Sequence, residues 1–171
     1  MNRFVIVALV GIGVGAGLGG CGPGAKGGPS MNNRIGGNEV TPAPSEVVSQ
    51  DILSREPVAN TATVKHILVS WKDLGDSFGG RQDQRAQQRT KQQAEAQVQS
   101  LLQQLKAGAD FDMLMKAHSE DAGSAASGQA FEVSPDAQLV IEFRQLSLRL
   151  QPDEIGVCQS DFGFHIIKRL K

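Results

Sequence analysis

The chain has 171 residues, a formal net charge of -1 and 40% hydrophobic residues. This length accommodates one ordinary domain with some accessory sequence, and the apolar content excludes a wholly disordered chain. No long basic stretch is present, so we do not expect nucleic acid as a partner. Cys21 and Cys158 are far apart and lack the spacing of metal ligands or of a disulfide framework, so neither a metal nor another cofactor is expected.

Residues 1–20 have the layout of a signal peptide. Arg3 precedes an apolar run that begins at Phe4 and contains no acidic residue. This run is short and rich in glycine, which favours a cleaved signal over a spanning helix. The segment Leu18–Cys21 (LGGC) resembles the lipobox of bacterial lipoproteins, which implies cleavage before Cys21 and acylation of its thiol.

We therefore expect an extracytoplasmic protein that a lipid on Cys21 anchors to a bacterial membrane, with the inner or outer membrane left open. An uncleaved transmembrane anchor is one alternative, and a secretory signal followed by an unmodified cysteine is another. Residues 22–61 are rich in glycine and proline and have no apolar periodicity. Such a segment cannot bury enough surface to offset its ordering entropy, so we expect a disordered tether.

The first element of the expected domain is a β-strand over residues 64–71. Its partial alternation places His66, Leu68 and Ser70 on one face and the intervening residues on the other. Apolar residues at helical spacing then predict one long helix over residues 84–106. Four basic side chains of this region are interpreted as the solvated face of the helix: Arg81, Arg85, Arg89 and Lys91.

The remaining elements follow from capping and turn signals. Asp110 is placed to cap a short helix, and Ser134–Pro135 to open a third helix as N-cap and first helical residue. Two short strands are expected over residues 156–159 and 164–169. The order β-α-α-β-α-β-β predicts an α+β domain over residues 62–171, with a four-stranded, mostly antiparallel sheet and about three to four helices.

Four segments of this region occur in a recognisable order. They are Val64–Val69 (VKHILV), Gly108–Phe111 (GADF), His118–Gly128 (HSEDAGSAASG) and Glu154–Lys168, which contains FGFHIIK. In this order they resemble the parvulin family of peptidyl-prolyl cis-trans isomerases, from about residue 63 to residue 171.

The resemblance implies a catalytic site and a pocket for the proline ring. The implied polar residues are His66, Asp121, Ser160 and His165, with the two imidazoles hydrogen-bonded to each other. The implied substrate-binding residues are Leu139 and Phe143 as pocket walls, Phe162 at the edge of the groove, and Ala130 where the family has a leucine.

Two departures from the family pattern concern this pocket. Ala130 and Phe131 stand where relatives have leucine and glycine, and Leu139 replaces a methionine. These differences predict a reshaped or weakened proline pocket.

We expect an isomerase that assists the folding of exported proteins at the membrane surface and acts on proline-containing, unfolded or extended polypeptides. The alternative is a catalytically weak or inactive binding module, a holdase or an assembly subunit. Without the resemblance, strand residues such as His66 and His165 are more often packed structural residues, and Cys158 is more simply a buried thiol than a nucleophile.

Overall fold

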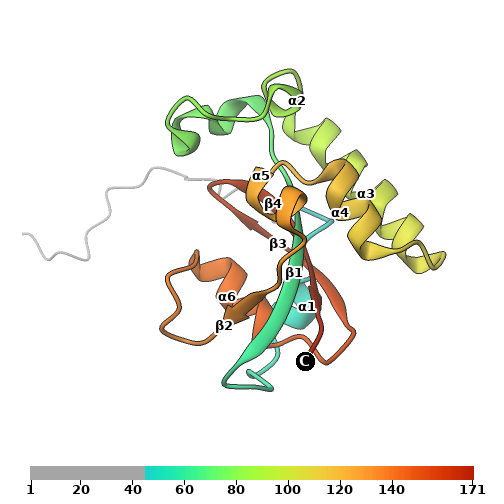
Figure 1. The fold of residues 1–171 in the computed structure, drawn as a ribbon, viewed down its shortest axis with the longest axis vertical. Coiled ribbons are helices and arrows are strands. Elements are labelled where there is room, and N and C mark those ends of the chain that lie inside the picture. Colours follow the sequence, from blue (N-terminus) through green and yellow to red (C-terminus); the bar gives the residue numbers. More distant parts are fainter. Residues whose placement is uncertain (1–44) are drawn as a thin grey trace, which may run out of the picture. The chain divides into compact units, whose positions relative to one another are not determined.

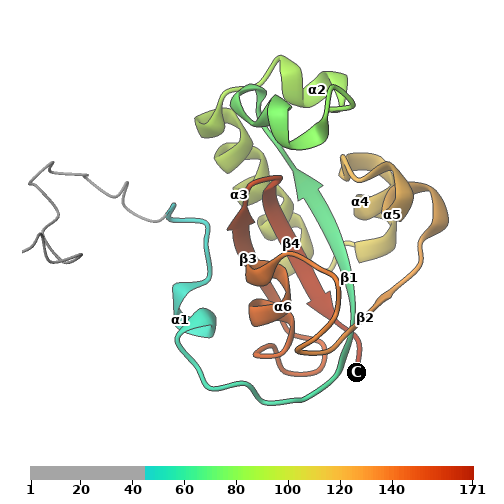
Figure 2. The same ribbon diagram turned by 90° about the vertical axis from the view of Figure 1, so that its left-hand side faces the viewer.

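Residues 45–171 are described by a computed structural model, and they form an α+β domain (Figures 1 and 2). The expected signal peptide, Cys21 and residues 22–44 of the expected tether lie outside the described residues. In chain order the elements are α1 (Gln50–Leu53), β1 (Ala62–Val69), the 3-10 helix η1 (Lys72–Phe78), α2 (Gln84–Gln87), α3 (Lys91–Lys106), α4 (Phe111–His118), α5 (Ala122–Ser127), β2 (Phe131–Val133), α6 (Ile141–Ser147), β3 (Ile155–Ser160) and β4 (Gly163–Arg169). None of the helices within residues 45–171 has the length and apolar content that crossing a membrane requires.

The four strands form one sheet in the order β2-β1-β4-β3, and every neighbouring pair is antiparallel. The predicted fold class is thus confirmed, and the sheet is antiparallel throughout. The register places Leu68 of β1 opposite His165 of β4, and Cys158 of β3 opposite the same histidine. Both histidines of the predicted site lie on the two central strands, His66 on β1 and His165 on β4.

The two faces of the sheet bury separate apolar clusters, because successive side chains of a strand point to opposite faces. One cluster contains Ile67 and Val69 of β1, and it packs under α3 and α4. The other contains Val64 of β1 and Ile167 of β4, and it packs under α6. Figure 1 shows α3 and α4 on one side of the sheet and α6 on the other.

The expected long helix over residues 84–106 is wrong in one respect, since the structure divides it into α2 and α3. The division is made by a capping box at Thr90. The Thr90 hydroxyl accepts a hydrogen bond from the Gln93 amide at 3.3 Å, and the Gln93 side chain accepts one from the Thr90 amide at 2.8 Å. These reciprocal bonds satisfy amide groups that a new helix start leaves without partners, so α3 begins at Lys91.

Of the four basic residues expected on a solvated helix face, Arg81 and Arg85 are exposed, whereas Arg89 and Lys91 pack against the domain. Arg89 is largely buried and forms an ion pair with the buried Glu120, at 2.8 Å between Nη1 and Oε1. Glu120 in turn accepts a hydrogen bond from the Ser70 amide at 2.7 Å. Lys91 lies over the ring of Trp71, with its Nζ 5.6 Å from the ring centroid. These contacts join α2 and α3 to the end of β1.

The third helix begins later than the sequence predicts, because Ser134 does not cap it. The Ser134 hydroxyl donates a hydrogen bond to the Asp136 carboxylate at 2.6 Å, and its carbonyl accepts one from the Ala137 amide in a tight turn. Helix α6 starts only at Ile141. Leu139 therefore lies in the loop before the helix and not on it.

Part of the expected tether is packed on the domain. Within residues 45–61, Ile52 of α1 is 4% exposed and belongs to the cluster under α6. Ser49 exchanges two hydrogen bonds with Val157 of β3, at 2.9 Å and 3.0 Å, and the Arg55 guanidinium contacts the Glu154 carboxylate at 2.8 Å. The packed domain thus extends N-terminally beyond the expected boundary at residue 62.

Candidate functional site

The two predicted strand histidines lie on one face of the sheet. His66 of β1 shares its face with Val64, and His165 of β4 shares its face with Ile167. Because β1 and β4 are antiparallel with Leu68 opposite His165, the two histidines are diagonal neighbours. Both side chains are buried, at 5% exposure each. The apolar cluster under α6 therefore continues into a polar pair of imidazoles.

These imidazoles are in direct contact. The Nδ1 atoms of His66 and His165 are 3.2 Å apart, and the rings are nearly parallel with centroids separated by 5.4 Å. The other nitrogen of His165, Nε2, lies 2.8 Å from the Ser160 hydroxyl. That hydroxyl also accepts a hydrogen bond from the Phe162 amide at 3.1 Å. The β3–β4 hairpin thus holds one end of the pair.

Asp121 holds the other end, and the segment before it explains its position. The Ser119 hydroxyl accepts a hydrogen bond from the Leu68 amide at 3.1 Å, and the Glu120 amide donates one to the Leu68 carbonyl at 2.9 Å. These bonds join residues 119 and 120 to β1 and bring the next residue beside His66. The Asp121 Oδ2 atom lies 2.9 Å from His66 Nε2.

Helix α5, which the sequence did not predict, fixes the Asp121 carboxylate. Asp121 is its N-cap and accepts a hydrogen bond from the Gly123 amide at 3.1 Å. The buried Ser124 hydroxyl donates to Asp121 Oδ2 at 2.6 Å and also lies 3.0 Å from His66 Nε2. Ser124 is a site residue that sequence reasoning missed, although it belongs to the GSA motif that supported the family resemblance.

The surroundings shift two of these groups away from their ordinary acidities. Hydrogen bonding to His66, supported by Ser124, holds the pKa of Asp121 well below its usual range, so the carboxyl is ionised at neutral pH. Burial, followed by the proximity of His66, lowers the pKa of His165 from 6.5 to about 3, so this imidazole is neutral at neutral pH.

With His165 neutral, one arrangement of protons gives every group of the network a hydrogen-bond partner. The Ser160 hydroxyl donates to His165 Nε2, His165 Nδ1–H donates to His66 Nδ1, and His66 Nε2–H donates to Asp121. This direction is assigned from the donors and acceptors available, and it uses the low pKa values of His165 and Asp121. The site then forms a continuous chain that ends on a fixed negative charge.

An apolar cavity of about 320 Å³ opens onto this chain. Its floor is formed by His66, Asp121 and His165. Its walls come from the loop before α6, from α6, from β2 and from the β3–β4 turn: Phe131, Gln138, Leu139, Val140, Phe143 and Phe162. Three predicted substrate-binding residues therefore line one cavity together with three of the four predicted polar residues. Their roles in binding and catalysis stay predictions.

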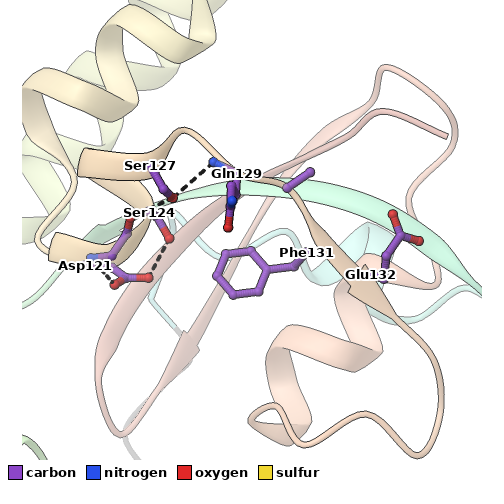
Figure 3. Close-up of a pocket in the computed structure, with 8 residues that line it drawn as sticks. Asp121, Ser124, Ser127, Gln129, Phe131 and Glu132 are labelled. Atoms are coloured by element: carbon purple, nitrogen blue, oxygen red, sulfur yellow. Dashed lines mark hydrogen bonds between the residues drawn. The ribbon is translucent and has the colours of Figure 1, made fainter.

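The structure does not place Ala130 in this cavity. Ala130 lines a neighbouring cavity of about 630 Å³ between α5 and β2, with Ser124, Ser127 and Gln129 (Figure 3). Phe131, the next residue, lines both cavities. Ala130, predicted as a substrate-binding residue, thus does not line the apolar cavity, whereas Phe131 does. A shift by one residue along an extended segment changes the face on which a side chain lies.

A third cavity of about 520 Å³ lies on the other side of Asp121. It shares His66, His165 and Phe162 with the apolar cavity and adds Phe78 of η1 and Arg81 from the loop that follows η1. The rings of Phe78 and Phe162 meet edge to face with centroids 5.3 Å apart. The three cavities meet at Asp121, which is the one residue that lines all of them.

Cys158 lies outside this chemistry. It is fully buried in β3, and burial raises the pKa of its thiol far above the ordinary value. The interpretation of Cys158 as a buried structural thiol agrees with this position. Within residues 45–171, no group of three His, Cys, Asp or Glu side chains lies together as metal ligands do.

Comparison with known proteins identifies residues 50–171 with the family model described as a PPIC-type PPIase domain. Among curated proteins, the foldase protein PrsA of Geobacillus kaustophilus is 26% identical over 124 residues, which are 72% of this chain and 44% of the relative. The chaperone SurA of Alkalilimnicola ehrlichii is 40% identical over 70 residues, which are 40% of this chain and 16% of the relative. The chain thus spans less than half the length of these two relatives.

Among solved structures, the peptidyl-prolyl isomerase ESS1 from Candida albicans superposes with a TM-score of 0.55 at 17% identity. The match covers 66% of this chain and 63% of the ESS1 chain. At this identity the likeness concerns the fold.

Proposed function

Since the chain belongs to the family of proteins with a PPIC-type PPIase domain, we propose that it is an active peptidyl-prolyl cis-trans isomerase. Its substrates are proline-containing segments of unfolded or extended polypeptides, and its role is to assist the folding of exported proteins at a membrane surface. One observation carries the catalytic part of the proposal. An apolar cavity opens directly onto a hydrogen-bonded chain of two buried imidazoles that ends on the Asp121 carboxylate.

The reaction makes no covalent bond between enzyme and substrate. Rotation about the X–Pro bond faces a barrier of roughly 18–20 kcal/mol, because the resonance of the amide must be broken. Without catalysis the rotation takes tens to hundreds of seconds. Only interactions that are stronger with the twisted amide than with the planar amide accelerate it.

The cavity walls serve the ring, and the polar floor serves the rotating carbonyl. Leu139 and Phe143 hold the prolyl ring by apolar contact, so that the residue before proline turns relative to a fixed ring. Amide resonance places negative charge on the carbonyl oxygen, and the ionised Asp121 beside it disfavours that resonance form. A preorganised electrostatic contact of this kind contributes on the order of 3 kcal/mol.

The Asp121 carboxylate is oriented by the other members of the polar chain, which are His66, His165 and Ser160. Their hydrogen bonds fix the position of the partly exposed Asp121 carboxylate, and a satisfied network needs little reorganisation during the reaction. In this proposal Asp121 is the group closest to the reacting amide, and the two imidazoles and Ser160 orient it.

A binding module without activity is the rival function, and it rests on the departure at Ala130. The loss of a leucine there removes no wall from the apolar cavity, because Phe131 lines it instead. This observation favours the enzyme over the holdase or assembly subunit.

A protease-coupled isomerisation assay on X-Pro tetrapeptides tests the proposal. We expect the wild type to accelerate the cis-to-trans step, and Asp121→Ala and His165→Ala to lower kcat/KM by about 100-fold. His118→Ala is the control, because His118 is a histidine on α4 that lines none of the three cavities. A wild-type rate equal to the thermal background, with retained binding of unfolded protein, would establish the binding module instead.

The membrane part of the proposal rests on the sequence alone. The lipobox-like LGGC segment supports acylation of Cys21, which would hold the domain at the bilayer. We expect Cys21→Ser to release the protein into the soluble fraction after export. Continued membrane retention of this variant would favour an uncleaved spanning helix over the lipid anchor.

A further inference from the structure

Phe131 occupies a position that connects the apolar cavity with its polar floor. It is the first residue of β2, and its backbone is paired with Val64 of β1. Its ring meets the imidazole of His66 edge to face, with centroids 5.2 Å apart and planes at 86°. It also lies 5.9 Å from the ring of Phe143 at 68°. Edge-to-face pairs at these separations are favourable and fix the ring orientation.

Phe143 completes this arrangement. Its ring is 5.2 Å from His66 at 88° and 5.6 Å from His165 at 83°. Phe131 and Phe143 therefore both stand nearly perpendicular to the floor made by the imidazoles. Two aromatic walls on a polar floor form a corner, and the cavity of about 320 Å³ lies in it.

Phe131 is also the partition between two cavities. The cavity between α5 and β2, of about 630 Å³, has Phe131 in its lining, and so does the apolar cavity. Figure 3 shows the ring of Phe131 between the side chains of α5, among them Ser124, and Glu132 of β2. The neighbouring Ala130 reaches only the larger cavity. Removal of the Phe131 ring would therefore join the two spaces.

We propose that Phe131 is a specificity-determining residue that contacts the prolyl ring and sets the size of the ring that the site accepts. This inference rests on the proposed isomerase function and goes beyond it. An aromatic wall suits proline, because aromatic grooves bind the rigid, apolar prolyl ring at little entropic cost. The Phe131 ring also separates the apolar cavity from the larger cavity that Ala130 lines, so a ring larger than proline meets Phe131.

The test compares peptides that carry proline with peptides that carry pipecolic acid, its six-membered homologue, in the same position. For Phe131→Ala we expect KM for the proline peptide to rise about tenfold with a smaller change in kcat, since an aromatic contact is lost. We also expect the ratio of kcat/KM for proline over pipecolate to fall by at least about fivefold. A residue needed only for folding would lower both values together and leave their ratio unchanged.

Two matched variants complete the design. Phe131→Leu keeps an apolar wall and should restore most of the proline preference. Ala130→Ser changes the adjacent residue, which does not line the apolar cavity, and should leave KM and the ratio at wild-type values. An unchanged ratio in Phe131→Ala, or an altered ratio in Ala130→Ser, overturns the assignment.

Binding of the same two peptides, measured by NMR titration, separates this proposal from the isomerase proposal. If the wild type binds proline peptides without isomerising them, the isomerase proposal fails, while the binding preference for proline still reports on Phe131. Equal affinity of Phe131→Ala and the wild type for both peptides overturns the role of Phe131 whatever the activity.

Discussion

Gly163 permits the β3–β4 hairpin to pass close to β1, and its substitution by alanine tests how the site is held. Its φ is +134°, a conformation that side-chain-bearing residues rarely adopt. A Cβ atom at this position would lie 2.6 Å from the Val69 carbonyl oxygen and 2.9 Å from the Ser70 Cα. Both atoms belong to the backbone, so no side-chain rotation relieves the overlap.

The expected cost of Gly163→Ala is therefore the backbone strain plus the displacement of the hairpin. Strained backbone conformations cost about 1–3 kcal/mol each. The shift needed to move β4 away from β1 adds the loss of packing and hydrogen bonds there, so we expect a total above about 4 kcal/mol. Because the hairpin also carries Ser160 and His165, catalysis should decrease at temperatures where the variant is still folded.

Urea denaturation monitored by the single tryptophan, Trp71, measures this cost. Trp71 is buried and its ring lies 5.1 Å from Phe164, so its emission reports on the same region. Gly108→Ala is the control, because its φ is +91° but no atom lies within 4 Å of the added Cβ. We expect about 1–2 kcal/mol for the control. Equal losses for both variants would refute the close-approach argument.

Three further predictions concern the hydrogen-bonded chain, the buried ion pair and the thiol. Ser124→Ala removes a hydrogen-bond donor to Asp121, so the pKa of that carboxyl should rise. In a pH–rate profile, the loss of activity on acidification should therefore move to higher pH. An unchanged profile would contradict the role of Ser124. Glu120→Gln leaves Arg89 without its buried anionic partner. In chemical denaturation, the free energy of unfolding should decrease by about 3 kcal/mol. A decrease under about 1 kcal/mol would indicate that the Arg89–Glu120 pair is solvated. Cys158 should resist maleimide labelling in the native protein and react in denaturant, as located by peptide mass mapping; fast native labelling would show that the strand opens.

The family resemblance suggested the residues of the site, whereas the strand pattern predicted only the face of β1 on which His66 lies, because alternation is a local property. The alternation predicts that His66 and Leu68 share a face, and the structure places both on the face that carries His165. The hairpin that carries His165 follows from short apolar runs around a turn. The contact between the two imidazoles, by contrast, depends on the register of β1 with β4, which the sequence alone does not determine.

Helix boundaries were less predictable, because competing local signals decide them. Residues 84–106 contain good helix formers throughout, and only the Thr90–Gln93 capping box signals the interruption. Ser134 has the features of an N-cap, but its hydroxyl bonds the Asp136 carboxylate. Phe131, and not Ala130, lines the apolar cavity because neighbouring side chains of an extended segment lie on opposite faces, and the sequence does not show which face is turned to the cavity.

In the proposed mechanism, the polar chain from Ser160 to Asp121 promotes isomerisation as one unit. The most direct test is the kcat/KM for an X-Pro peptide of the wild type, Ser160→Ala, Asp121→Asn and the double variant, each with its fold verified by circular dichroism. Residues that act as a unit show non-additive losses, so the double variant should be little slower than the slower single variant. A double variant whose loss equals the product of the two single losses would show that Ser160 and Asp121 act independently, and a wild type no faster than the uncatalysed reaction would show that the protein is not an isomerase.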